Sequence, residues 1–471
     1  MGGIQVRQSA LRIVLAASLL GLGALAEEAP KPPPPEWKFA AHGFLGGSLY
    51  AADGFMGPSP GQQTLFAVGQ PRDDKIDFGG DIRQNRINLS VSGPSVLGGT
   101  PKGVVEMDFF GGNSSGGFGD VSVWPRMRVT YAELAWENTT LRVGQDYQLT
   151  AGISTLSGPA TAGAMSFPTS VGHIAFPISF EAGAVGWRYP GIYLFQRMPM
   201  GDNKLELAFS VQRSAWSNPA NPASQALTIG TAGTPVPGGT TVTLAPTYFT
   251  ATTDLGSASG IPALEARVTY ALGSMLGITV FGHYGQIDPS GWGLEQQPGT
   301  CPATSAAQLK PTACDTMTVY VVGGDFRLNV APLIIQGGGY TGQNTSAMLG
   351  EVLQFNNLGV GDTSDWGAWA QVGFMFTKQL GLYVFAGTDH PDTAALTLGA
   401  QQYLKNTTTQ AMLRYYDQGW AYGLEWTHWH TNTRTNPGAI TINGAAASAV
   451  IPQAITAQDV NQYMFSTYYF F

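Results

Sequence analysis

Hydrophobic and polar residues alternate with a period of two along much of this chain. Val105, Met107 and Phe109 share one face of such a segment. Glu106 and Asp108 fall between them, on the opposite face. Because successive side chains of a β-strand point to opposite faces, this pattern predicts strands with one apolar and one polar face.

The polar faces carry charges that hydrocarbon would not tolerate. Arg142 and Asp146 lie opposite the apolar face that begins at Leu141, and segment 263–270 repeats the pattern. An Arg or Lys that faced the midplane of a bilayer would cost about 2–4 kcal/mol. We therefore expect the apolar faces to meet lipid and the charged faces to line a water-filled lumen.

The alternating segments are numerous, and each is near the roughly 9–11 residues that a tilted strand needs to cross a bilayer. We predict an all-β fold, a transmembrane antiparallel β-barrel of about 16 strands over residues 38–471. Since predicted boundaries can shift by about two to four residues, counts of fourteen and eighteen stay open. The predicted strands are 38–50, 79–93, 102–110, 126–136, 139–147, 189–198, 203–213, 261–272, 276–286, 316–329, 332–342, 366–378, 380–388, 406–417, 419–431 and 459–471.

Short and long connections alternate between these strands. Tight turns such as 200–203, 272–275 and 417–419 contain the Gly, Asn and Asp residues that suit hairpins. This alternation predicts short periplasmic turns and long extracellular loops, as in an outer-membrane barrel. The long loops are predicted at 51–78, 111–125, 148–188, 214–260, 287–315, 343–365, 389–405 and 432–458.

The last strand is rich in aromatic residues and ends at Phe471. Tyr463, Phe465 and Tyr469 share the face that would meet lipid. Such a strand resembles the closing strand of bacterial outer-membrane barrels. The resemblance implies that Phe471 is part of the signal read by the barrel assembly machinery. An aromatic-rich end of a soluble sheet is the alternative.

The other end of the chain has the pattern of an export signal. Arg7 and Arg12 precede an apolar run that ends in Ala-Leu-Ala at 24–26, which predicts a signal peptide over 1–26. Residues 27–37 then form a Pro-rich periplasmic spacer, stiffened by the prolines at 32–35.

Composition agrees with a barrel and excludes other classes. Charged residues make up only 11% of the chain, against about 25% in soluble proteins. After residue 26, no stretch approaches the roughly 18 apolar residues of a spanning helix. Loss of Arg7 and Arg12 with the signal would take the formal charge from −8 to −10. An acidic chain without a basic patch gives no support to nucleic-acid binding.

The two cysteines, Cys301 and Cys314, lie in one irregular segment. An exported protein sits in an oxidising compartment, which favours a disulfide between them. A metal site is the alternative, but no histidine lies nearby.

Three local segments carry a family resemblance: 81–90, 126–134 and 141–145. An Arg-x-Arg strand that leads to Tyr-x-Glu-Leu, a turn, and a strand ending Val-Gly-Gln resembles the second to fifth strands of Gram-negative general porins, most closely the DcaP-like trimeric group. The resemblance implies passive diffusion of small hydrophilic solutes through a homotrimer in the bacterial outer membrane, surrounded by lipid and lipopolysaccharide. Members of that group can carry an N-terminal coiled coil, whereas this chain offers only the short spacer.

The resemblance also implies that the loop after the fifth strand folds into the lumen and narrows it. Here that loop is 148–188, and His173 is the only titratable side chain between residues 148 and 180. An external flap is the alternative. Strand 380–388 is apolar on both faces, which suits a strand covered by a neighbouring subunit or by an inward loop.

Opposite the inward loop, such porins carry arginines on strands two to five. Of Arg83 and Arg86, which differ in parity, Arg86 fits an inward position better. An uncharged constriction loop would leave these arginines without acidic partners from the loop, so we hypothesise a weak bias toward small anions such as carboxylates. A solvated wall with mutual pairing is the alternative. The predicted pore-lining residues are Arg86, Glu106, Asp108, Arg126, Arg128, Arg142, Asp146 and His173.

Other chemistry finds less support in the sequence. His428 and His430 share one strand face, but a third metal ligand is missing, and Asp73, Asp74 and Asp77 offer at most a weak cation site. We predict no enzyme and no cofactor. A plugged barrel that acts as an adhesin or receptor, and an outer-membrane hydrolase, stay as alternatives to the porin.

Overall fold

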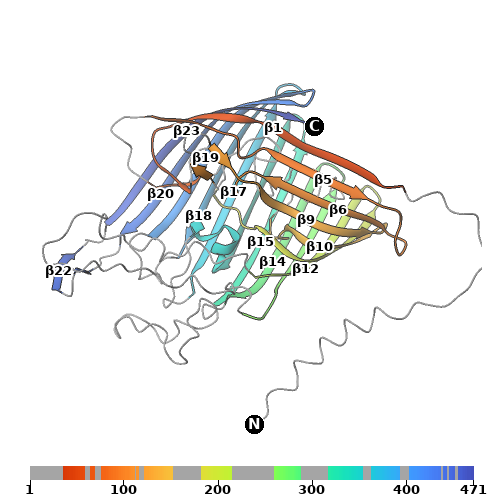
Figure 1. The fold of residues 1–471 in the computed structure, drawn as a ribbon, viewed down its shortest axis with the longest axis horizontal. Coiled ribbons are helices and arrows are strands. Elements are labelled where there is room, and N and C mark those ends of the chain that lie inside the picture. The colour runs from red at the N-terminus through yellow and green to blue at the C-terminus, as the bar shows by residue number, and fades with distance from the viewer. Residues whose placement is uncertain are drawn as a thin grey trace, which may run out of the picture. The chain divides into compact units, whose positions relative to one another are not determined.

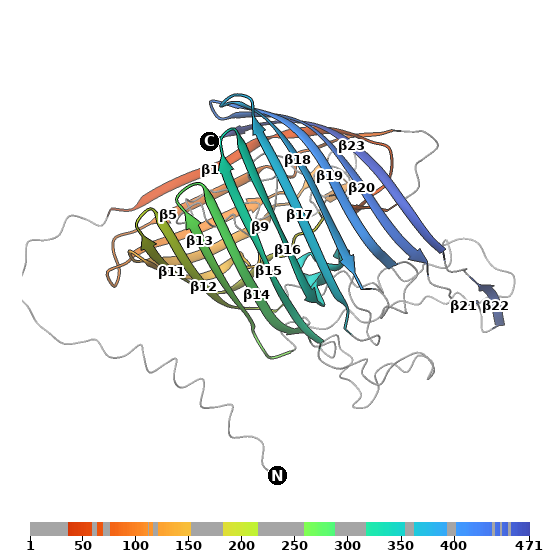
Figure 2. The ribbon, with the colours of Figure 1, turned by 180° about the vertical axis from the view of Figure 1, so that it is seen from behind.

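Residues 38–471 form one antiparallel β-barrel in the computed structural model (Figures 1 and 2). The structure describes residues 36–58, 64–68, 76–111, 113–115, 121–151, 182–214, 259–287, 317–353, 362–392, 402–435, 439–442, 445–450 and 454–471. The predicted signal peptide and most of the predicted spacer lie outside these residues, as do Cys301, Cys314, Asp73, Asp74 and His173.

Sixteen strands close the barrel, which confirms the predicted fold class. Residues 82–85 leave the ladder and split the second strand into β4 and β5. Both parts pair with β1, so they count as one strand of the barrel. The strands are β1 (Lys38–Ala52), β4 (Asp77–Asp81) with β5 (Arg86–Ser92), β6 (Thr100–Asp108), β9 (Arg126–Ala135), β10 (Thr139–Tyr147), β11 (Arg188–Met200), β12 (Asn203–Gln212), β13 (Ala263–Leu272), β14 (Leu276–Ile287), β15 (Met317–Val330), β16 (Leu333–Gln343), β17 (Ser364–Met375), β18 (Leu380–Pro391), β19 (Gln402–Asp417), β20 (Trp420–Thr435) and β23 (Ala454–Phe470).

The seam of the barrel joins the first strand to the last. β1 pairs with β23 from Phe44 opposite Phe470 to Ala52 opposite Gln462. Phe471 extends this seam, because its backbone N–H donates to the Gly43 carbonyl and its carbonyl accepts from the Gly43 N–H, both at 3.1 Å. The barrel is therefore closed where β1 and β23 overlap.

The two faces of the wall differ as the alternation predicts. Large arginines such as Arg86, Arg128 and Arg267 are buried on the lumen side. Exposed apolar side chains occupy the outward positions and form a surface that suits lipid. They include Leu45, Leu49, Leu89, Ile192, Leu194, Leu264, Val268, Val280, Leu424, Tyr463 and Phe465.

Aromatic rings gather at the end of the wall where β19 turns into β20. Trp420 lies 5.1 Å from Tyr469 and 6.4 Å from Tyr422, measured between ring centroids. Amphipathic rings of this kind form the girdles of membrane barrels at the lipid–water boundary.

Short elements fill several of the long connections. None of the helices among the described residues is long and apolar enough to cross a membrane. The short elements are β2 (Met56–Pro58), β3 (Thr64–Ala67), β7 (Asn113–Ser115), β8 (Val121–Val123), the 3₁₀ turns η6 (Thr345–Met348) and η7 (Glu351–Leu353), β21 (Ala439–Ile442) and β22 (Ala445–Val450).

We predict that Val268→Arg destabilises the barrel, because Val268 lies near the middle of β13 on the outward face and is 46% exposed. The expected loss is about 2–4 kcal/mol in the free energy of unfolding, measured by denaturant titration in lipid vesicles. Val268→Met is the matched control and should cost less than about 1.5 kcal/mol. Equal stability of the two variants would contradict a lipid-facing Val268.

Candidate functional site

A charged wall runs along the lumen side of β5, β6, β9 and β10. Arg128 is central to it, with Nε 2.9 Å from Glu106 Oε1 and Nη1 2.6 Å from Asp108 Oδ2. A β-bulge places it there: Glu106 opposes Val129 while Met107 opposes Met127, so Arg128 is the extra residue of its strand. Bulges of this kind re-aim a side chain, and here one guanidinium reaches two carboxylates.

The other predicted arginines of this wall are also paired with acidic residues. Arg126 Nη2 lies 2.7 Å from Asp108 Oδ2, and Arg86 Nε lies 3.7 Å from Glu106 Oε1. The structure thus brings together Arg86, Glu106, Asp108, Arg126 and Arg128 in one network, which is buried except for the partly exposed Arg126.

Arg142 belongs to a second set of contacts on β10. Its Nη2 lies 2.7 Å from Glu133 Oε2, and its Nη1 also pairs with Asp146. Its guanidinium lies 3.9 Å from the ring centroid of Tyr131, within range of a cation–π contact. The arginines therefore find acidic partners on neighbouring strands, whatever the charge of the loop.

Arg188, the first residue of β11, differs from these arginines and was missed by the sequence analysis. It is 2% exposed, and its Nε and Nη1 have no hydrogen-bond partner among the described residues. Its guanidinium lies 4.1 Å from the ring of Trp187, and that of Arg126 lies 5.8 Å from the same ring. Among the described residues Arg188 forms no ion pair, and a buried guanidinium without an acidic partner is costly. The adjacent Trp-Arg pair at the start of a strand was the available signal.

Both described ends of the loop 148–188 lie inside the barrel. Near its start, the Leu149 N–H donates to Glu265 Oε2 at 2.6 Å. Glu265 is on β13, where it also lies 2.9 Å from His283 Nδ1. The two ends meet where the Trp187 N–H donates to Gln148 Oε1 at 2.7 Å.

Residues 182–187, here named the inward strap, cross to the opposite wall. The Gly183 N–H donates to Asp389 Oδ1 at 2.9 Å, and the Ala182 N–H donates to Thr408 Oγ1 at 3.2 Å. Gly183 has a φ of +94° and lies directly against Gly367, where a Cβ would meet the strap. Glycines therefore permit the close approach of the strap to β17 and β18.

The strap also accounts for the apolar inner face of β18. Gly387 lies under the Ala182 carbonyl, and a Cβ there would collide with that oxygen. Tyr383 and Phe385 are buried further along the same face. The strap covers the lumen side of this strand at Gly387 and Asp389.

Asp365 is the centre of a polar network beneath the strap. It accepts hydrogen bonds from Tyr340 Oη at 2.8 Å, Thr345 Oγ1 at 2.7 Å and the Glu351 N–H at 2.9 Å. Burial, and then the nearby Asp365 carboxylate, raise the pKa of Glu351 well above its usual range. The network holds η6 and η7 on the wall that receives the strap.

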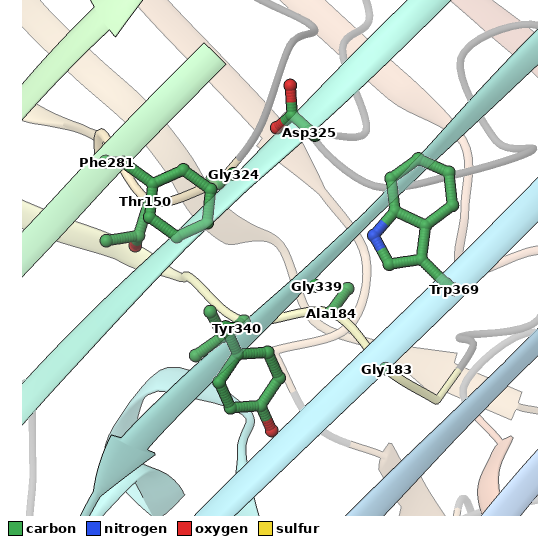
Figure 3. Close-up of a pocket in the computed structure, with 11 residues that line it drawn as sticks. Thr150, Gly183, Ala184, Phe281, Gly324, Asp325, Gly339, Tyr340 and Trp369 are labelled. Carbon is green, nitrogen blue, oxygen red and sulfur yellow. The ribbon is translucent and has the colours of Figure 1, made fainter. Parts of the chain in front are cut away.

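A pocket of about 250 Å³ remains between the strap and β14–β17 (Figure 3). The rings of Phe281, Tyr340 and Trp369 line it together with Asp325 and strap residues. Figure 3 shows Gly183 and Ala184 of the strap beside these side chains. The lining offers apolar surface and one carboxylate, and no nucleophile paired with a base.

His428 and His430 lie on the outer face of β20, away from the lumen network. His430 Nδ1 is 2.7 Å and His428 Nε2 is 3.4 Å from Asp459 Oδ1. The described part of the chain contains no group of three or more side chains arranged to hold a metal ion.

No protein-family model and no curated protein matches this sequence. The fold is similar to that of the outer membrane channel DcaP of Acinetobacter baumannii, with a TM-score of 0.56 and 13% identity over 92% of this chain and 97% of that chain. An anion-selective porin from Comamonas acidovorans gives a TM-score of 0.49 and 9% identity over 93% of this chain and 100% of that chain. Salmonella typhi OmpF in complex with daunomycin gives a TM-score of 0.47 and 10% identity over 92% of this chain and 97% of that chain. The predicted resemblance to porins is confirmed at the level of the fold.

We predict that Gly387→Val displaces the strap, because the new side chain would collide with the Ala182 carbonyl. Overpacking costs about 1–3 kcal/mol. A cost of about 1.4 kcal/mol would raise the equilibrium constant for release of the strap from the wall about tenfold. A cysteine at Val185, which is buried in the strap, should therefore react about tenfold faster with a water-soluble maleimide.

The background for this test is Cys301→Ser with Cys314→Ser. The control is Gly381→Val on the same strand, where a Cβ meets only side-chain atoms of Met375 and Tyr383. Unchanged reactivity of the cysteine at Val185 in the Gly387→Val variant would show that the strap does not depend on this close approach.

Proposed function

We propose that this protein is an outer-membrane porin that allows passive diffusion of small hydrophilic solutes. Its fold and apolar outer wall are those of a bacterial outer-membrane protein. The observation that carries the proposal is the charged lumen wall, with Arg128 at its centre, inside a barrel whose outer face suits lipid. The mechanism is size exclusion with an electrostatic bias, and it has no covalent step.

The narrowest part of the pore is proposed to lie between the charged wall and the loop 148–188. The contacts of Leu149 with Glu265 and of Gly183 with Asp389 support this role, because they hold both described ends of the loop inside the barrel. His173 lies outside the described residues and keeps its predicted place in the constriction. Homotrimer formation, the lipopolysaccharide environment and the assembly role of Phe471 are part of the same proposal.

The bias toward small anions, such as carboxylates, is proposed to depend chiefly on Arg188. Ion pairs neutralise much of the charge on Arg126, Arg128 and Arg142. Arg188 forms no ion pair among the described residues, and it lies close enough to Arg126 and Arg128 to add to their positive potential. An anion that enters the constriction would supply the missing acceptor for a guanidinium that is already desolvated.

The function is tested by recording single channels of the purified protein in planar bilayers under a salt gradient. The expected record shows conductance steps in groups of three and a reversal potential of the sign that anion preference gives. A silent protein would favour a plugged adhesin or receptor, or a hydrolase, over diffusion.

A second test replaces the unpaired charge. Arg188→Gln should lower the anion-to-cation permeability ratio roughly two- to fivefold, because one unscreened charge near the path is removed while the barrel is unchanged. The control is Arg197→Gln on the same strand, since Arg197 pairs with Glu206 at 3.2 Å. The assignment to Arg188 fails if both variants shift the ratio equally, or if neither does.

A further inference from the structure

We infer that the connection between β1 and β4 is a second inward element, and that it and the strap together confine solutes to the charged wall. The element is the β2–β3 hairpin, which packs against the lumen side of β19, β20 and β23. The inference rests on the proposed diffusion function and adds the route that solutes follow. The sequence pattern predicted only the loop 148–188 inside the lumen.

Hydrogen bonds fasten the hairpin to the inner wall. The Ala67 N–H donates to Thr431 Oγ1 at 2.9 Å, and Thr431 Oγ1 donates to Asn406 Oδ1 at 2.8 Å. Asn406 Nδ2 in turn donates to the Leu65 carbonyl at 2.9 Å. Thr431 and Asn406 are buried and come from the two adjacent strands β20 and β19, so the hairpin is attached where these strands meet.

The inner wall beneath the hairpin also has an apolar patch. Trp429 is 0% exposed and packs with Met56, Ala67 and Val460. In an unobstructed lumen this large side chain would face water, and the free energy gained by its burial would be lost. The wall is therefore built to receive the hairpin.

A bulge near the first residues of β19 supplies one more contact. The ladder between β19 and β20 shifts register between Tyr403 and Lys405. Tyr403 then packs on the ring of Phe66, with centroids 4.6 Å apart. The hairpin thus has matched aromatic, aliphatic and polar contacts with this part of the wall.

The base of the hairpin is anchored to the closing strand. The Asp53 N–H donates to the Asn461 carbonyl at 3.1 Å, and Asp53 Oδ1 accepts from the Asn461 N–H at 2.7 Å. Phe55 and Val68 close the hairpin, since the Val68 N–H donates to the Phe55 carbonyl at 2.9 Å. Both arms of the connection are therefore held at the wall.

The strap and the hairpin cover complementary parts of the lumen. Val185 of the strap packs with Phe281, Tyr340 and Met348, which belong to β14, β16 and η6. Gly183 extends this cover to β18, and the hairpin continues it over β19, β20 and β23. These contacts leave out β5 and β6, which carry Arg86, Glu106 and Asp108. Solutes consequently pass along that part of the wall.

The first test shortens the hairpin by replacing residues 55–68 with a four-residue Gly-Ser linker. Single-channel conductance should rise about twofold, and the anion-to-cation permeability ratio should fall. The ratio falls because solutes could then pass more than a Debye length, about 8 Å at physiological salt, from the arginines. A shortened protein with the conductance and selectivity of the parent would overturn the inference.

The second test uses the full-length chain, in the Cys301→Ser and Cys314→Ser background. Thr431→Cys, beneath the hairpin, should resist a water-soluble cationic thiol reagent that enters the pore. Arg126→Cys, on the charged wall, should react and change the current in a single step. Equal reactivity at the two positions would overturn the inference even if the shortened variant does not fold.

The two proposals fail in different ways. If the parent protein conducts but Thr431→Cys reacts freely, the diffusion function stands and the hairpin does not confine the solutes. A parent protein that does not conduct, in which Arg126→Cys also stays unreactive, would remove the diffusion function and the route that depends on it.

Discussion

Closure of the sheet at the β1–β23 seam is the constraint on which the rest of this structure depends. Inside a bilayer no water can satisfy an open strand edge, so every backbone polar group must pair with another strand. The reciprocal hydrogen bonds of Gly43 and Phe471 bring the ladder to the last residue of the chain. Once the sheet is closed, its outer face meets lipid and its inner face meets the lumen. The period-two alternation then decides which side chains face lipid and which face the lumen.

That separation makes the lumen a place where charge is paired rather than excluded. Glu106 and Asp108 come from one strand, while the guanidinium of Arg128 comes from the next and reaches both because of a bulge. Pairs of this kind hold the wall rigid, since removal of one partner would leave the other buried and uncompensated. They also reduce the net electric field along the wall, so ion selectivity depends on charged groups that are not in such pairs.

The sequence predicted the barrel well because its strands are long and strongly periodic. The range 139–147 coincides with β10, and the predicted first strand differs from β1 by only two residues. The break between β4 and β5 was missed, although the polar run at 83–86 interrupts the alternation there. The inward position of Arg86 was assigned from parity alone, and the structure buries that residue.

The contacts that shape the lumen could not be predicted in the same way. The hydrogen bond of Leu149 with Glu265 spans 116 residues, and that of Gly183 with Asp389 spans 206. No local pattern encodes such contacts. A local sign of the β2–β3 hairpin is the apolar run at 65–68 within an otherwise polar loop.

The inward elements and the unpaired Arg188 have a common physical basis. An element that crosses a wet lumen must satisfy its own backbone groups there, which the strap does through Asp389 and Thr408 and the hairpin through Thr431 and Asn406. The inward elements therefore cover the walls that provide these partners. The ion pairs of Arg128 with Glu106 and Asp108 lie on β6 and β9, outside those walls. Arg188 stands where the strap ends and β11 begins.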